Sequence, residues 1–240
     1  TGTASEAAML VSHPDQLLGN VSILSSMEFQ QFDLLRRVRQ YQDNCMRFDT
    51  MIGLRVASLE ERLRIDQSST FLTGVGQIVG GTRLDLFDQF STRNQFFGFV
   101  IGGQYNRRFA QWSMDVRTML SLGNNRAEAN VTGQTTTSVP SAGSATFQGG
   151  LLAQQTNIGK VTRDRFMLIP EFYVGGRTLI ARNWEANLGY AFMYWSDAVQ
   201  PGNQIDTRVS QFPPEPSAGQ NPRARFRTES VVIHGLQAGL

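Results

Sequence analysis

The most regular alternation of apolar and other side chains in the chain covers residues 184–194. One face of this segment carries aromatic residues at both ends and aliphatic ones between them: Trp184, Ala186, Leu188, Tyr190, Phe192 and Tyr194. A period of two predicts a β-strand. About 11 residues of this kind suffice to cross a bilayer as a tilted strand. The apolar face therefore meets either a protein core or lipid.

Four further segments show the same alternation and predict strands: residues 94–106, 110–123, 164–180 and 225–240. Only a few residues, around 107–110, separate the first two, which predicts a β-hairpin. A short turn around 180–183 leads into the strand at 184–194. Neighbouring strands along the sequence are therefore expected to pair in antiparallel fashion.

Two earlier segments, 27–38 and 46–66, fit a strand and an amphipathic helix about equally well. In the first, Met27 and Phe29 are out of phase with Phe32, so a strand would require a β-bulge near Gln30. The helix alternative rests on good helix formers and on apolar spacings of three. In the second, Ser58 and Glu61 stand at capping-box spacing.

Polar, glycine-rich and proline-rich stretches predict three long loops, near 67–92, 124–162 and 197–223, whereas the turns near 41–45, 107–110 and 180–183 are short. Long connections on one rim and short turns on the other are typical of an outer-membrane barrel, whose short turns face the periplasm. A soluble β-sandwich, the alternative class, does not require this asymmetry.

Composition excludes several classes of protein. The chain has 240 residues, and its 22 Lys and Arg against 20 Asp and Glu leave a net charge of +2, which indicates no nucleic-acid partner. Its longest apolar runs, such as residues 96–102, fall well short of the 18 or more residues of a membrane helix. Cys45 is the single cysteine, so no disulfide can form within the chain.

The faces opposite the apolar ones carry charges of both signs, which would be costly in a soluble core and are expected in the lumen of a barrel. The predicted lumen-lining residues are Asp115, Arg117, Glu171, Arg177, Glu185, Arg227 and Glu229, and Asp33, Asp49 and Arg55 lie in the same phase. Aromatic residues at the strand ends predict interfacial girdles formed by Trp112, Trp184, Tyr194 and Phe226.

No catalytic, cofactor or metal site emerges from the sequence, and we expect a protein that is not an enzyme. His13 and His234 lie far apart, and Cys45 has no visible base partner, so neither a serine nor a cysteine nucleophile is indicated. Asp85, Asp88, Asp164 and Asp206 match no EF-hand spacing; solvated or arginine-paired carboxylates are favoured over a calcium site. The glycine pairs near Gly80 and Gly102 form no nucleotide-binding fingerprint.

Three ordered blocks of sequence carry a resemblance to a known family. They are NQFFGFVIGGQY, the pair GGLLAQQTNIG and RDRFMLIPE, and LGYAFMYWSDAVQPGNQID. From about Ser25 to its end the chain resembles the β-barrel porin-like family of planctomycete outer membranes, long catalogued as a domain of unknown function. The resemblance implies strands at the two ambiguous segments, an outer-membrane location and a closed antiparallel barrel, and it brings no catalytic residues.

Together these features predict an all-β, antiparallel up-and-down transmembrane β-barrel over residues 1–240, with about seven strands in this chain. That odd number, and the upstream strands and terminal aromatic residue of family members, lead us to expect a fragment of the barrel. Outer-membrane lipid, the barrel-assembly machinery during insertion and small hydrophilic solutes are the expected partners. The expected function is passive diffusion of such solutes; the alternative is a non-conducting structural or surface-interaction barrel acting through its long loops.

Overall fold

The computed structural model describes residues 9–181, 184–210 and 220–239, which form one antiparallel β-sheet without an α-helix. Its long strands and the short β5 follow in order: β1 (Leu17–Gln42), β2 (Met46–Phe71), β3 (Arg83–Arg108), β4 (Trp112–Val139), β5 (Gly143–Gln148), β6 (Gly159–Ala181), β7 (Trp184–Val199) and β8 (Thr228–Gly239), with one 3-10 turn, η1 (Gly202–Gln204), before β8. The prediction of an all-β antiparallel fold is confirmed, including strands at both ambiguous segments.

The strands pair in the order β1-β2-β3-β4-β6-β7-β8, so each long strand lies beside its neighbour in the sequence, while β5 pairs with the far end of β4. The register aligns apolar residues in rows across the sheet. One row runs through Leu34, Leu54, Phe99, Leu122 and Leu168 on five successive strands. Because side chains alternate between faces, all the residues of this row lie on the same face of the sheet.

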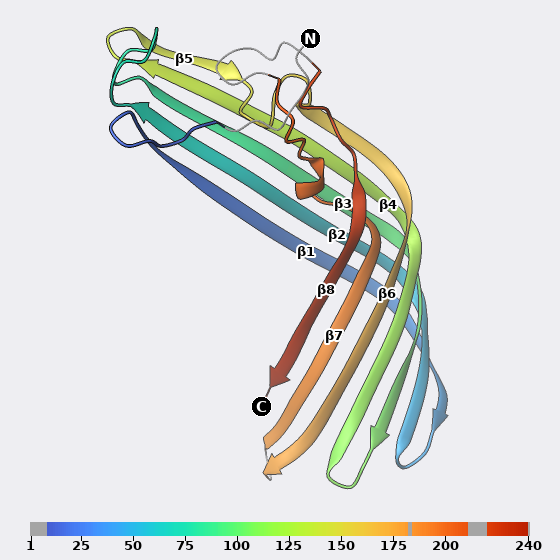
Figure 1. Ribbon diagram of the computed structural model, residues 1–240. Coiled ribbons are helices and arrows are strands. Elements are labelled where there is room, and N and C mark those ends of the chain that lie inside the picture. Colours follow the sequence, from blue (N-terminus) through green and yellow to red (C-terminus); the bar gives the residue numbers. More distant parts are fainter. Residues whose placement is uncertain (1–8, 182–183, 211–219, 240) are drawn as a thin grey trace.

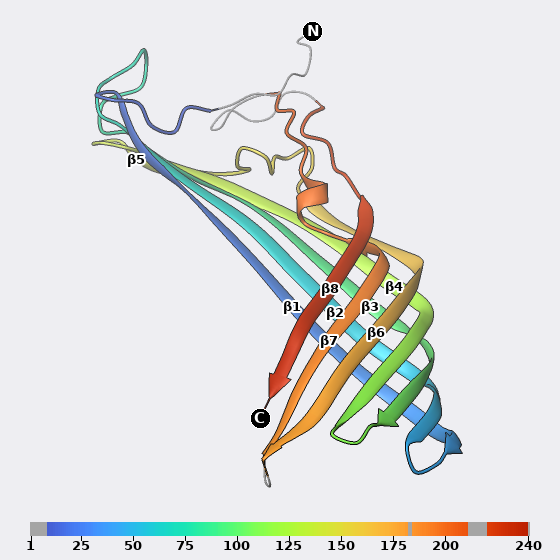
Figure 2. The ribbon, with the colours of Figure 1, turned by 60° about the horizontal axis from the view of Figure 1, so that its bottom comes forward.

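The sheet bends and curls into a half-barrel (Figures 1 and 2). The lower halves of the long strands curl until β6, β7 and β8 lie opposite β1 and β2, whereas the upper halves of β1–β4 flatten and run away from the curl. The short turns at 43–45 and 109–111 lie together at the lower end. We call the concave face of the curl the inner face and the convex face the outer face.

Two of the expected long loops are mostly strand. Of residues 67–92 only 72–82 lie outside β2 and β3, and of residues 124–162 the part up to Val139 belongs to β4. The polar composition of these segments misled the prediction, because their apolar inner-face residues are few or small, such as Ala127 and Ala129, and alternate with polar residues that face solvent. The expected loop at 197–223 contains η1, and residues 211–219 lie outside the described residues.

The β-bulge expected near Gln30 is absent: β1 pairs with β2 in continuous register from Leu17 to Arg39, and the register shifts only between Arg39 and Tyr41. The change of phase has another cause. Phe29 points to the inner face and packs against Trp195, whereas Phe32 points outward and is 68% exposed. The strand therefore presents apolar residues to two different surroundings without breaking its ladder.

The main buried cluster lies inside the curl, where the two walls of the half-barrel meet. Ala57, Leu59 and Phe96 of the β2–β3 wall contact Met167 and Ile169 of β6 and Trp195, Ala198 and Val231 of β7 and β8. We call this set the Trp195 cluster. A smaller cluster nearer the short turns joins Met51, Val100 and Met119. Both clusters consist of inner-face residues, so the inner face is not uniformly polar.

Candidate lumen and outer apolar belt

The outer face of the lower half carries a continuous belt of exposed apolar and aromatic side chains, which we call the outer apolar belt. Its large members are Phe32, Leu34, Ile52, Leu54, Val56, Phe97, Phe99, Ile101, Trp112, Phe166, Leu168, Phe172, Trp184, Leu188, Tyr190, Val232 and Leu236. On β3 the belt runs from Phe97 to Tyr105, and on β4 from Leu122 to Trp112. These lengths are about the 9–11 residues that a tilted strand needs to cross a bilayer.

Above the belt the same outer face becomes charged, starting four residues beyond Val56 on β2 and Phe97 on β3. Arg93 pairs with Glu60 at 2.7 Å, Arg64 with Asp66 at 2.7 Å, and Lys160 with Glu128 at 2.7 Å. Exposed ion pairs of this kind belong in water, where they contribute little to stability. The upper halves of β1–β4 therefore extend beyond the apolar layer as a water-exposed sheet.

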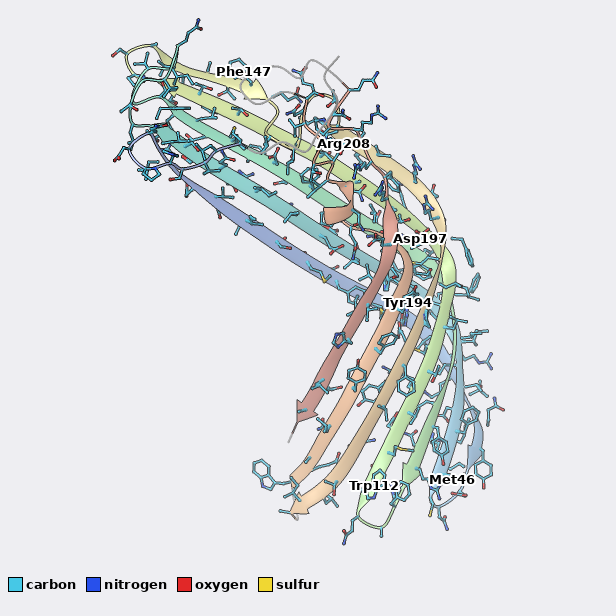
Figure 3. The ribbon with its side chains drawn as sticks, viewed as in Figure 1. Met46, Trp112, Phe147, Tyr194, Asp197 and Arg208 are labelled. Atoms are coloured by element: carbon cyan, nitrogen blue, oxygen red, sulfur yellow. The ribbon has the colours of Figure 1, made fainter. Side chains whose placement is uncertain are left out.

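The predicted girdle residues fall in two groups. Trp112 and Trp184 are exposed at the short-turn end of the belt, and Tyr194 lies on the outer-facing phase of β7 near the bend (Figure 3). Phe226 does not belong to the belt. It precedes β8 and packs against inner-face residues, with the Arg163 guanidinium 4.9 Å from its ring centroid. The sequence could not place Phe226, because the chain before β8 folds back over the inner face.

An ion-pair cluster crosses the interior of the curl at the level of Arg55. This side chain is fully buried on β2 and donates two hydrogen bonds of 2.7 Å to the carboxylate of Asp33 on β1. It also donates to Glu171 on β6, on the opposite wall. Arg55 lies between the Trp195 cluster on one side and the Met51 cluster on the other. A buried arginine with two carboxylates is stable only because each partner is hydrogen-bonded.

Below Arg55 the inner face opens into a polar cavity of about 780 Å³ at the short-turn end, which we call the lower vestibule. Three of the predicted lumen residues line it: Asp115, Arg177 and Glu185. Arg37, Arg47 and Arg108 line it too and were not among the predicted lumen residues. The signal for Arg37 and Arg47 was present, since both stand in the same strand phase as Asp49.

The remaining predicted lumen residues are distributed along the inner side. Arg117 is exposed beside Glu171 in a second cavity, with its guanidinium 5.6 Å from the Tyr173 ring centroid. Glu229 is exposed on β8, and Arg227 lies just before that strand, where its backbone N–H donates to Gln204. The structure thus brings Arg117 and Glu171 together and keeps Arg227 and Glu229 away from the lower vestibule. Trp195 was missed, although an aromatic residue in the lumen phase of its strand is a signal for a filled interior.

Two carboxylates hold loop segments in place: Asp88 fastens one to the inner side of the upper sheet, and Asp206 joins Arg208, Arg223 and Arg225 within the segment between η1 and β8. Asp88 on β3 accepts backbone N–H bonds from Leu151, Leu152 and Ala153, between β5 and β6. Burial raises the pKa of Asp88 to about 6, against the opposing effect of these amides. Burial also acts to raise the pKa of Asp206, but hydrogen bonds from Arg208 and backbone amides outweigh it and lower the pKa to about 2.

Neither a metal cluster nor a membrane helix is found in the part of the chain that the structure describes. Within residues 9–181, 184–210 and 220–239, no three His, Cys, Asp or Glu side chains come together to hold a metal ion. No helix among these residues is long and apolar enough to span a membrane. Of the carboxylates considered for calcium, Asp85 pairs with Arg83 and Asp164 accepts from Asn124.

Comparison with known proteins bears on the identity of this curled sheet. The family described as Putative beta barrel porin-7 (BBP7) matches residues 1–240. The chain belongs to this family. Membership agrees with the expected porin-like family and indicates a membrane barrel. No curated protein and no solved structure matches the chain.

Proposed function

We propose that this BBP7 family member forms a passive, non-enzymatic pore in a bacterial outer membrane that lets small hydrophilic solutes diffuse through its lumen. The observation that carries the proposal is the contrast between the two faces of the lower half. The outer face is a bilayer-high apolar belt, and the inner face behind it holds Arg55, Glu171 and the polar lower vestibule. Lipid on one side and water on the other is the environment that this contrast fits.

A closed barrel requires strands beyond the seven long ones described. The edges of the sheet are β1 and β8, and every pairing between them is antiparallel, so both edges run in the same direction. Closure with antiparallel neighbours only therefore requires an odd number of further strands between them. Backbone groups in lipid must be paired, which makes closure obligatory in a membrane.

The test is planar-bilayer recording from the full-length barrel purified in detergent. Stepwise currents at constant voltage are expected, with a conductance that grows in proportion to salt concentration. A matched preparation of the heat-denatured protein controls for detergent leaks. Failure to observe any step currents from a folded barrel at several voltages would rule out the pore.

The second candidate function is a non-conducting barrel that acts through its surface. The Trp195 cluster favours it, because the fully buried Trp195 and Phe96 side chains fill the space between the walls, and Arg55 seals the level below. The Trp195→Ala variant distinguishes the two candidates. If the protein is a pore, the wild type conducts and the Trp195→Ala variant conducts more. If the barrel is filled, the wild type shows no current.

A further inference from the structure

More arginines than carboxylates line the lower vestibule. Five arginines line it: Arg37, Arg47, Arg107, Arg108 and Arg177. They face three carboxylates, those of Asp43, Asp115 and Glu185. We propose that the lower vestibule binds small anions bearing carboxylate or phosphate groups, and that it makes the pore prefer anions to cations. The anion preference rests on the proposed pore function, whereas the anion binding does not.

Two of the three vestibule carboxylates, those of Asp115 and Asp43, are engaged by neutral donors. Asp115 accepts hydrogen bonds from the side-chain amides of Gln104, at 2.9 Å, and of Asn106. Asp43 accepts the backbone N–H groups of Cys45 and Met46 at 2.7 and 2.6 Å. Few lone pairs of these two carboxylates therefore remain to replace the hydration shell of a cation.

Several of the arginines have donors to spare. Arg177 reaches Glu185 only at 3.8 Å, and both side chains are more than half exposed. Arg108 forms no ion pair within the described parts of the chain. The guanidinium of Arg107 lies over the Phe109 ring, 5.1 Å from its centroid, and forms no ion pair among those residues, although its charge acts on the nearby Asp43 carboxylate. A planar guanidinium with free N–H groups suits the paired oxygens of a carboxylate or phosphate.

The buried carboxylate of Asp49 does not remove the excess. It pairs with Arg47 at 2.8 Å and lies 3.9 Å from Arg37. Arg39, directly opposite Asp49 in the strand register, adds a further cation beside it. The charges of Asp49 and Arg39 therefore cancel, and the lower vestibule keeps more arginines than carboxylates.

The next level of the lumen is neutral. There Arg55 and Arg117 face the two carboxylates of Asp33 and Glu171. The ion preference of the path is therefore set in the vestibule, where a cavity with low-dielectric walls concentrates the field of its charges. In water, one net positive charge about 6 Å away raises the local concentration of a monovalent anion about threefold and lowers that of a monovalent cation about threefold, so the anion-to-cation ratio becomes about ten.

Reversal potentials across a bilayer with a KCl gradient measure the preference. We expect the wild-type pore to pass chloride about tenfold more readily than potassium. The double variant Arg108→Gln, Arg177→Gln is expected to lower this ratio to about one, since both side chains are on the surface of the cavity and their loss leaves the fold intact. Glu185→Gln is expected to raise the ratio. Arg62→Gln, on the outer face of the upper sheet, is the matched control and leaves it unchanged.

Binding of inorganic phosphate to the full-length protein in detergent, followed by the phosphorus NMR line width, tests the site without any current. Broadening that weakens in the double variant and persists in Arg62→Gln supports the vestibule as an anion site. If neither the wild type nor any variant conducts, the proposed pore function is rejected, and the phosphate measurement alone tests the anion site. A chloride-to-potassium ratio of one or less in the wild type, or phosphate broadening that the double variant leaves unchanged, overturns it.

Discussion

Arg55 on β2 and Glu171 on β6 lie on opposite walls of the half-barrel and form an ion pair across its interior, with Asp33 as the second partner of the arginine. The guanidinium is fully buried, whereas the two carboxylates keep a small exposed fraction. Burial of all three groups is favourable only while the cluster is complete. The pair therefore links the two walls at the level between the apolar clusters.

Removing the arginine is expected to leave two carboxylates facing each other without a cation. Arg55→Met should lower the free energy of unfolding by about 3–5 kcal/mol. Urea titration of the barrel in detergent, followed by tryptophan fluorescence, measures the loss. The triple variant Arg55→Met, Asp33→Asn, Glu171→Gln is the control and should recover most of it. Equal losses in the single and triple variants would show that the volume of Arg55 matters, and its charge does not.

Trp195 is expected to limit both stability and passage. It is fully buried, with the Phe29 ring centroid 6.0 Å away in an edge-to-face arrangement. Trp195→Ala should cost about 3–5 kcal/mol by leaving a cavity between the walls. In single-channel recordings the same cavity should raise the conductance. Trp184→Ala, an exposed tryptophan on the same strand, is the matched control and should change neither quantity strongly. An unchanged conductance in Trp195→Ala would place the narrowest point elsewhere.

The outer apolar belt predicts where a charge is tolerated on one and the same strand. Val116 on β4 lies within the belt, and Thr132 lies on the same face above it. Val116→Arg should destabilise the barrel by about 2–4 kcal/mol in a bilayer, whereas Thr132→Arg should cost about 0–1 kcal/mol. Unfolding in lipid vesicles measures both variants. Similar costs at the two positions would show that the belt does not face lipid.

The attachment of residues 151–153 to Asp88 is expected to depend on pH. The pKa of Asp88 is raised to about 6 because the carboxyl is buried, so the folded protein holds this proton more tightly than the unfolded chain, whose carboxyl titrates near 3.8. The local free energy of opening should therefore fall as pH rises from about 4 to about 6, and level off above. Hydrogen exchange at the Ala153 amide, corrected for its intrinsic pH dependence, measures this change. Asp88→Asn should abolish the trend and is the matched variant.

The sequence by itself determined the local order of the sheet. A period of two at Trp184–Tyr194 and in the other alternating segments is a direct consequence of strand geometry, so these strands and the division of their residues between two faces follow from residue spacing alone. The short turns near 43–45 and 109–111 make adjacent strands pair, which fixes the antiparallel order. The same period placed Glu171 and Arg177 together on the strand face opposite the apolar one.

Only the tertiary structure decided which inner-face residues meet and how far the strands extend. Arg55 and Glu171 are 116 residues apart, and the curl of the sheet, which no local pattern encodes, brings β2 against β6. The polar ends of β2, β3 and β4 are strands because paired neighbours satisfy their backbone groups, whatever their composition. Phe226 lies half-buried on the inner side of the sheet, and not in the expected girdle, because its segment folds back over Ala127 and Ala129. Alternation reports the faces of a strand, whereas contacts across the lumen depend on how the whole sheet bends.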